Sequence, residues 1–155
     1  MDQQQSGKQT GLMPGVPGPA RWLGLAGLIP FAAGAIATWV LEPPFSILAR
    51  DMLAVYGAVI LSFMGGCRWG FAAAGLGSGP GWLPLATSVA PAIFGWITVF
   101  SPHPQPFFYL SVGFAALLGA DLLLTKEGGA PDWWPSLRWP LTAGVIASLS
   151  AAGFA

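Results

Sequence analysis

The sequence predicts an all-α membrane protein, a polytopic helical bundle of about five transmembrane helices, on the strength of two observations. First, 54% of the 155 residues are apolar and only 8% are charged, whereas soluble domains carry about 25% charged residues. Second, several apolar stretches approach the roughly 20 residues that a helix needs to cross the hydrocarbon core. Lipid offers no water to backbone groups, so such stretches must satisfy their own hydrogen bonds, as helices do. A water-soluble globule is thereby excluded.

The first residues, 1–20, are rich in Gln, Gly, Pro and Ser and bury little, so we expect a disordered cytoplasmic N-terminal tail. Residues 21–155 then form a single membrane domain. Its first span, residues 22–41, contains no charged residue and ends before the turn-forming Glu42-Pro43-Pro44. A cleaved signal peptide is the alternative for this segment, with Ala35-Ile36-Ala37 as the cleavage site. The apolar sequence continues beyond that site, which favours a span.

The other four spans follow from the charges and the turn-forming residues. Residues 69–120 carry no formal charge and are too numerous for one helix. Two stretches rich in Gly or Pro, residues 75–81 and 101–106, are therefore expected to separate consecutive helices. The resulting spans are residues 52–74, 82–100, 107–124 and 139–155. The last of these is the shortest, and Pro140 is tolerated in its first turn.

The distribution of Lys and Arg predicts how the chain is oriented in the membrane. With five spans, the side that holds the N-terminus also holds five of the six basic residues, which are Lys8, Arg21, Arg68, Lys126 and Arg138. The sixth, Arg50, falls on the other side. We therefore expect a bacterial inner (plasma) membrane protein, or a mitochondrial inner membrane protein in a eukaryote. Its N-terminus is expected in the cytoplasm and its C-terminus outside.

Tryptophans gather at the same expected interface. They are Trp22, Trp69, Trp82, Trp133, Trp134 and Trp139. An indole ring prefers the boundary between lipid and water, so we expect an aromatic belt there. The alternative is a stacking platform for a ligand.

Arg68 lies inside the second span, where an arginine costs about 2.5–3.5 kcal/mol on insertion scales and so needs a partner or a route to the interface. Asp121 lies in the fourth span, at a depth that differs by only about one helical turn. We therefore expect an Arg68–Asp121 ion pair. The alternative is that each side chain reaches the interface separately.

Further polar groups fall at this depth. Pro30 and Pro91 interrupt the first and third spans, where each is expected to kink its helix and to free one backbone carbonyl. Thr87 and Ser88 lie at the second of these sites. The candidate polar cluster therefore comprises Arg68, Asp121, Thr87 and Ser88. A simple kink, with the carbonyl bridged by a hydroxyl, is the alternative at each proline.

Small residues in the second span predict a close contact between helices. The spacing Gly66-x-x-x-Gly70 lets two helix backbones approach each other, and Ser62 and Gly65 extend the same strip. The alternative, a glycine-rich phosphate cradle, requires a loop that opens a helix, whereas these residues lie late in an apolar segment. Cys67 in the same run is expected to be a small buried residue rather than a reactive thiol.

The composition excludes several classes of protein. Six Lys and Arg residues balance six Asp and Glu residues, so no basic surplus is available to bind nucleic acid. One cysteine and one histidine cannot supply the three or four ligands of a zinc site, so no metal is expected. The chain contains no G-x-S-x-G, H-E-x-x-H or Walker-type motif. We therefore expect no catalytic residues, no cofactor and no enzymatic activity.

The run of residues 56–70, YGAVILSFMGGCRWG, resembles the signature of an uncharacterised bacterial and mitochondrial membrane family. This family is catalogued as domain of unknown function 3429 and includes the transmembrane protein 69-like proteins. Weaker matching pieces are residues 23–31, 88–91, 113–114 with Asp121, 131–134, 137–138 and 141–142. The resemblance covers about residues 20–150. It implies a small multi-span inner-membrane protein without an established reaction.

Two functions fit these observations. The first is a scaffold, assembly or accessory factor that packs through its small-residue helix faces, with the lipid bilayer, another membrane protein or a second copy of the chain as partners. The second is a carrier or binding protein for a small solute, lipid or quinone that uses the polar cluster around Arg68 and Asp121. A carrier needs a cavity open to water around Arg68, whereas a scaffold fills this space with side chains.

Overall fold

The computed structural model describes residue 13 and residues 15–155, and this part of the chain contains five α-helices and no strand. The helices are α1 (Gly18–Val40), α2 (Phe45–Ala73), α3 (Trp82–Thr98), α4 (Gln105–Lys126) and α5 (Trp134–Gly153). In α1, α4 and α5 a proline lies in the first turn, where its missing N–H leaves no hydrogen bond unmade. After α2, the chain reverses at glycines with positive φ, including Gly75 and Gly77.

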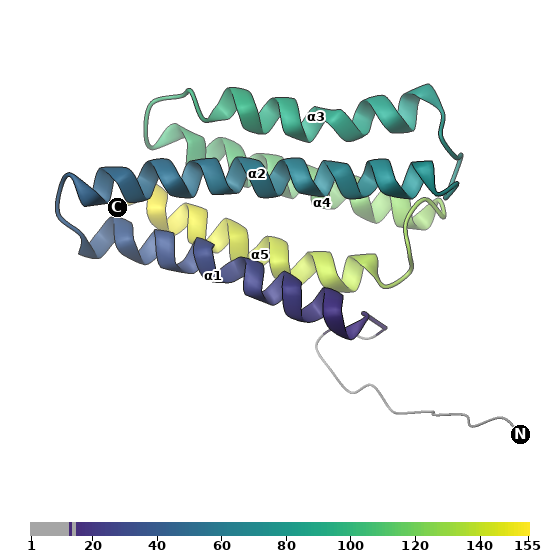
Figure 1. The fold of residues 1–155 in the computed structure, drawn as a ribbon, viewed down its shortest axis with the longest axis horizontal. Helices are drawn as coiled ribbons and strands as arrows, with labels where there is room; N and C mark the ends of the chain where they lie inside the picture. The colour runs from purple at the N-terminus through teal and green to yellow at the C-terminus, as the bar shows by residue number, and fades with distance from the viewer. Residues whose placement is uncertain (1–12, 14) are drawn as a thin grey trace, which may run out of the picture.

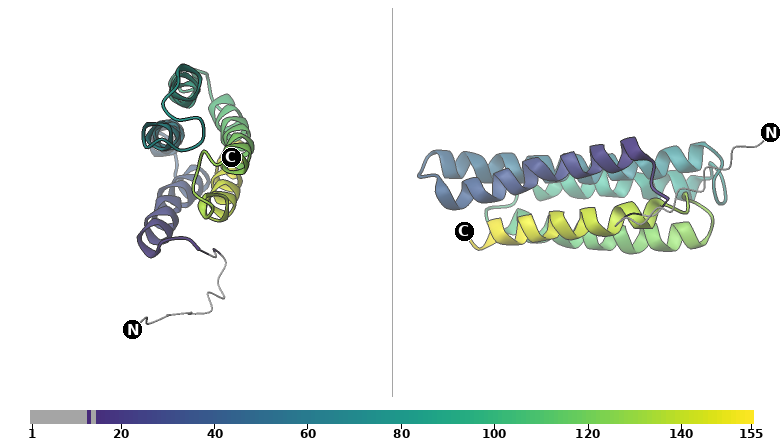
Figure 2. Two further views of the ribbon diagram at one scale, coloured as in Figure 1. Left: turned by 90° about the vertical axis from the view of Figure 1, so that its right-hand side faces the viewer. Right: turned by 90° about the horizontal axis from the view of Figure 1, so that it is seen from below.

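Successive helices run in opposite directions along one long axis (Figure 1). The first turn of α1, the α2–α3 loop and the α4–α5 loop therefore lie at the same end of the bundle. We call it the basic end, because Arg21 and Lys126 lie there. Seen from this end, α2 and α4 lie between α3 on one side and the α1–α5 pair on the other (Figure 2). The closest packing is between α2 and α3, between α4 and α5, and of α1 on α2 and α5.

Large apolar side chains cover the outside of the bundle as well as its core. The largest fully buried side chains include Phe31, Phe107, Phe114, Leu61, Leu110 and Leu149. The exposed ones come from every helix and include Ile29, Val59, Ile97, Leu123 and Trp139. A soluble protein rarely exposes so much apolar surface. Because α1, α2 and α4 are long and apolar enough to cross a membrane and α3 is a shorter apolar helix, the predicted all-α, multi-pass membrane fold is confirmed.

Packed residues lie before residue 20, where the N-terminal tail was predicted to end. Met13 and Val16 are buried in one apolar cluster with Trp134 and Leu137, and α1 begins at Gly18. These two side chains supply the apolar surface that the rest of the segment lacks. Residues 1–12 and 14, including the predicted basic residue Lys8, lie outside the described residues.

Two helices begin earlier than the predicted spans. α2 begins at Phe45 instead of residue 52, and its charged Asp51 lies exposed near His103, with 2.9 Å between Asp51 Oδ1 and His103 Nε2. α5 begins at Trp134 instead of residue 139. In both cases a charged residue indicates the limit of a span in the sequence, whereas a helix can continue through a charge that has a partner or reaches water. As a result Arg138 lies inside α5.

The close contact between α2 and α3 lies at Gly65, one residue before the predicted Gly66. A Cβ atom on Gly65 would collide with the backbone carbonyl oxygen of Ser88. A Cβ atom on Gly66 or Gly70 would meet nothing within 4 Å. Successive helical residues point about 100° apart, so the step from Gly65 to Gly66 turns the residue away from α3. The prediction that Gly66 and Gly70 pack inside this bundle is therefore wrong, whereas Gly65 is at a contact.

Pro30, Pro91 and Pro140 all lie within continuous helices. Because α5 begins at Trp134, the prediction that Pro140 lies in the first turn is wrong. α1 continues through Pro30 and α3 continues through Pro91, so neither proline interrupts its helix. Beside Pro30, Tyr56 Oη of α2 donates a hydrogen bond of 3.0 Å to the backbone oxygen of Gly27. Ser62 donates to the backbone oxygen of Ala58 in its own helix.

Candidate functional site

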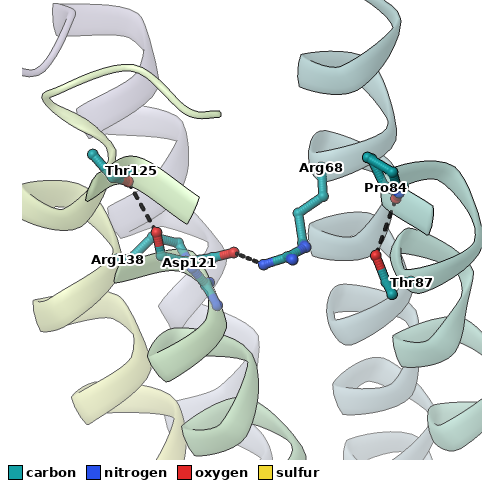
Figure 3. Close-up of polar contacts among 6 residues, drawn as sticks. All are labelled: Arg68, Pro84, Thr87, Asp121, Thr125 and Arg138. Carbon is teal, nitrogen blue, oxygen red and sulfur yellow. Dashed lines mark hydrogen bonds and ion pairs between the residues drawn. The ribbon is translucent and has the colours of Figure 1, made fainter. Parts of the chain in front are cut away.

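One buried carboxylate binds two arginines from two other helices (Figure 3). Arg68 Nη1 in α2 donates to Asp121 Oδ1 in α4 over 2.9 Å, so the predicted ion pair is present. Arg138 Nε in α5 donates to the second oxygen, Asp121 Oδ2, over 2.8 Å. We call these three residues the ion cluster. It connects α2, α4 and α5 in the half of the bundle nearer the basic end.

The early start of α5 positions Arg138. Trp134 lies one turn before it on the same helix, and Arg138 Cζ lies 5.9 Å from the centroid of the indole ring, within the range of a cation–π contact. On α4, Thr125 Oγ1 donates a hydrogen bond of 2.9 Å to the backbone oxygen of Asp121 (Figure 3). The guanidinium of Arg138 is thus held between an aromatic ring and a carboxylate.

The ion cluster contains one more positive than negative charge, because two guanidinium groups share one carboxylate. The Asp121 and Arg138 side chains are 1% and 3% exposed, and the Arg68 side chain is 13% exposed. A buried charge without full compensation is costly, since the interior cannot replace the hydration that the ion loses. The excess positive charge of the ion cluster is therefore expected to destabilise the bundle unless a further negative charge compensates it.

The space around Arg68 is not filled by side chains. Arg68 and Thr87 line two hollows, of about 480 Å³ between α2, α3 and α4 and of about 490 Å³ towards the α2–α3 loop. The second hollow is also lined by Ser78 and Glu127 at the basic end. On the side away from Asp121, Arg68 thus borders a mostly apolar hollow and a second hollow that has polar side chains towards the basic end.

A third cavity, of about 280 Å³, lies between α1, α2 and α5. Its walls are mostly apolar and include Leu28, Phe31, Met64, Leu141 and Val145. Trp134, Arg138 and Thr142 also line it, and each has a buried side-chain atom without a hydrogen-bond partner among the residues that the structure describes. These atoms are Trp134 Nε1, Arg138 Nη2 and Thr142 Oγ1. We call this space the α5 cavity.

Thr87 and Ser88, which were predicted to join the polar cluster, bind within α3 instead. Thr87 Oγ1 donates to the backbone oxygen of Leu83 and to that of Pro84, the second of which Figure 3 shows. Ser88 Oγ donates to the backbone oxygen of Leu85. A hydroxyl in a helix reaches the carbonyl three or four residues earlier with little loss of entropy. Thr87 therefore faces the hollows beside Arg68 without a bond to the ion cluster, and Ser88 lies at the α2–α3 contact.

Two other residues at the α5 cavity differ in their environment from what the sequence indicates. Trp134 was expected in an aromatic belt but is buried, and its ring makes T-shaped contacts with Phe71 and Trp133. Cys67 is half-buried and lines the cavity.

Within residues 13 and 15–155, no three His, Cys, Asp or Glu side chains are grouped so that they could hold a metal ion.

Comparison with known proteins gives the family. Residues 16–154 match the family described as protein of unknown function (DUF3429). The chain belongs to this family. It is similar to transmembrane protein 69 of Xenopus tropicalis, with 36% identity over 136 residues that cover 86% of this chain and 53% of that protein. It is also similar to transmembrane protein 69 of Mus musculus, with 34% identity over 125 residues that cover 79% and 50% of the two chains.

This member of the DUF3429 family thus spans about half the length of the curated relatives that it matches. No solved structure matches it. The relatives are named as transmembrane proteins, in agreement with the apolar surface of the bundle. The resemblance that residues 56–70 indicated is confirmed.

The sequence contained a signal for the residues that were missed. Trp134, Arg138, Thr142, Val145 and Leu149 follow one another at intervals of three or four residues and are all buried. This spacing places them on one face of a helix. The charge of Arg138 hides this pattern, because a basic residue before an apolar stretch also fits the flank of a span.

Proposed function

We propose that this protein is a membrane-embedded binding protein or carrier for a small solute, lipid or quinone, with the ion cluster as part of its binding site. One observation carries the proposal: the charged residues Arg68 and Arg138 border open spaces within the bundle. A cluster that served only to hold helices together would be enclosed by side chains and balanced in charge. The ion cluster has one excess positive charge, and although Asp121 and Arg138 are almost fully buried, both arginines line a cavity or a hollow.

The proposal includes an orientation. We infer that the basic end lies at the cytoplasmic face of a bacterial inner membrane, or at the matrix face of the mitochondrial inner membrane in a eukaryote. The supporting observation is that Arg21 and Lys126 lie at this end, because loops that carry Lys and Arg stay on the cytoplasmic side. A ligand would then meet the ion cluster from the inner half of the bilayer.

Mass spectrometry of the protein, purified with its surrounding lipid, tests the binding function. We expect the wild-type protein to retain a small molecule that is enriched over the bulk lipid. Arg68→Gln should lose that molecule, since the variant keeps a balanced Arg138–Asp121 pair but no longer has the excess charge. Asp51→Asn, which changes the exposed contact with His103, is the matched control and should retain the molecule. If the wild-type protein carries no enriched molecule, the proposal is wrong.

A second candidate function, a scaffold or accessory factor, is favoured by a different observation. Gly66 and Gly70 lie on an exposed strip of α2 with open space around them. Small residues four apart let a second helix approach closely within lipid, so the strip could receive a helix of another membrane protein or of a second copy of the chain. Gly66→Leu and Gly70→Leu should then change the co-purifying proteins or the oligomeric state. An unchanged profile in both would exclude this candidate.

A further inference from the structure

Three polar side chains on one face of α5 line the same cavity, and each has a buried hydrogen-bonding atom without a partner among the described residues. Trp134, Arg138 and Thr142 are spaced four residues apart and are 5%, 3% and 2% exposed. Trp134 Nε1, Arg138 Nη2 and Thr142 Oγ1 have no partner among the described residues, and all three side chains line the α5 cavity. Buried polar groups are nearly always hydrogen-bonded. Three exceptions in one place therefore indicate a ligand.

Thr142 differs from most of the hydroxyls in the helices of the bundle. The hydroxyls of Thr38, Ser62, Thr98, Ser111, Thr125 and Ser148 each donate to a backbone oxygen three or four residues earlier. Thr142 Oγ1 lies within the same kind of helix but makes no such bond. Its hydroxyl therefore has no acceptor among the described residues, and its side chain lines the α5 cavity.

We propose that the α5 cavity binds a single-chain amphiphile with an anionic head, such as a fatty acid carboxylate. The inference rests on the binding function proposed above and names its ligand class. The head accepts a hydrogen bond from Arg138 Nη2, and Trp134 Nε1 and Thr142 Oγ1, one helical turn before and one after Arg138, are the further donors that it can use. The first part of the hydrocarbon chain lies against the apolar walls.

The charge of the ion cluster favours an anionic head over a neutral one. Asp121 has a single negative charge, and its two oxygens divide between Arg68 and Arg138. The charge of Arg138 is therefore not fully compensated. Arg68 has the hollows beside α3 on its other side, whereas Arg138 has the α5 cavity. One negative charge at Arg138 Nη2 would make the local charge zero, and hydrogen bonds between ionised groups are the strongest class.

The walls and the opening of the cavity favour a hydrocarbon chain. Leu23 of α1 and Phe63 of α2 line the cavity and are also exposed on the outside of the bundle, so the cavity reaches the lipid-facing surface between these helices. α1 and α2 lie close at the loop that joins them and diverge towards the basic end (Figure 1). A chain could therefore enter from the bilayer or extend into it. A volume of about 280 Å³ is near the lower end of ordinary ligand sites, which suits a head and part of one chain.

Three ligands with the same chain and different heads test the inference. The full protein is placed in phosphatidylcholine nanodiscs, and binding of radiolabelled laurate is measured against empty discs. Dodecyl phosphate and dodecanol are added as competitors. We expect dodecyl phosphate to displace laurate at similar concentrations and dodecanol to require at least tenfold more. Acetate, an anion without a chain, should not compete.

Conservative variants assign the binding to the named atoms. Thr142→Val keeps the shape of the side chain and removes its hydroxyl, and Trp134→Phe keeps an aromatic ring and removes Nε1. Each should weaken laurate binding about threefold to tenfold, the usual effect of one hydrogen bond. Arg138→Gln should weaken it more than tenfold and should remove the preference for laurate over dodecanol.

A variant that fills the cavity covers the case in which Arg138→Gln does not fold. A Cβ atom on Gly27 would meet only Tyr56 Oη, at 3.9 Å, so Gly27→Leu has room to extend into the α5 cavity. We expect it to fold and to abolish laurate binding. Gly66→Leu adds the same side chain outside the cavity and should bind laurate as the wild-type protein does.

The outcomes separate this inference from the proposed function. Equal competition by dodecanol, competition by acetate, or laurate binding that Gly27→Leu leaves unchanged would each overturn the inference. If the wild-type protein retains an enriched molecule that depends on Arg68 but not on Gly27 or Thr142, the binding function holds and the α5 cavity is not its site. If no molecule is retained and laurate does not bind, both proposals are wrong.

Discussion

Arg138 Nε lies 2.8 Å from Asp121 Oδ2, on the carboxylate oxygen that Arg68 does not use. A single carboxylate therefore joins three helices, and neither arginine can replace the other. Removal of each member of the ion cluster should have a different effect, which depends on the charges that it leaves behind.

Asp121→Asn should be the most damaging change in the ion cluster. It leaves two buried positive charges without a counter-charge, so we expect the free energy of unfolding to fall by about 3–5 kcal/mol. Denaturant titration in mixed micelles measures this loss. Asp51→Asn, whose carboxylate is exposed, should change stability by no more than about 1 kcal/mol. A loss of the same size in both variants would show that the ion cluster does not stabilise the bundle.

A second mutation at Arg138 should restore part of the stability that Asp121→Asn loses, whereas a second mutation at Arg68 should restore little. With Arg138→Gln added, the remaining charge is Arg68, which borders two hollows, so part of the loss should be recovered. With Arg68→Gln added, the remaining charge is Arg138, which is almost fully buried, so little should be recovered. The same titration on the two double variants checks this order. Equal recovery would mean that Arg138 reaches water.

Gly65→Leu should destabilise the protein, whereas Gly66→Leu should not. The first places a side chain against the backbone of Ser88, which cannot move without shifting α3, at a cost of about 1–3 kcal/mol. The second places it in open space. Thermal unfolding of both variants in detergent gives the comparison. Unchanged stability of Gly65→Leu would contradict the close contact between α2 and α3.

Tyr56→Phe should weaken the attachment of α1 to α2. The change removes the hydrogen bond to the Gly27 carbonyl but keeps the ring beside Phe31, so we expect a loss of about 0.5–1.5 kcal/mol. Tyr109→Phe is the matched control, because Tyr109 is exposed on α4. Unfolding midpoints of the two variants should therefore differ, with the lower value for Tyr56→Phe.

A reporter after Ala155 should lie on the opposite side of the membrane from a reporter inserted between α4 and α5. α5 has 20 residues, which corresponds to about 30 Å at 1.5 Å per residue. We expect the inserted reporter to be active in the cytoplasm and the C-terminal one outside. If both report the same side, α5 does not cross the membrane.

The five helices and the Arg68–Asp121 pair could be predicted because they depend on local composition and on depth along a helix. The contact at Gly65 could not, because it depends on the rotation of α2 about its axis. Four neighbouring small residues fit several rotations equally well. Only the packing of α3 against α2 decides between Gly65 and Gly66.

The role of Arg138 could not be predicted because a basic residue before an apolar stretch has two interpretations. As a flank it lies in water and limits the span; as a helical residue it lies in the bundle and needs a counter-charge. The choice depends on whether α4 presents Asp121 with a free oxygen, and that follows from tertiary structure. The unmet groups of Trp134 and Thr142 depend on the same choice.

The position of the three charged residues along the chain has a consequence for biosynthesis. A ribosome releases Arg68 and Asp121 before Arg138, so α2 and α4 can enter the membrane and form a neutral pair while α5 is still being made. Asp121 Oδ2 is then available when Arg138 arrives, which lowers the cost of moving a charged helix into lipid. The excess positive charge is created only by the last helix, when the rest of the bundle is already in place to receive it.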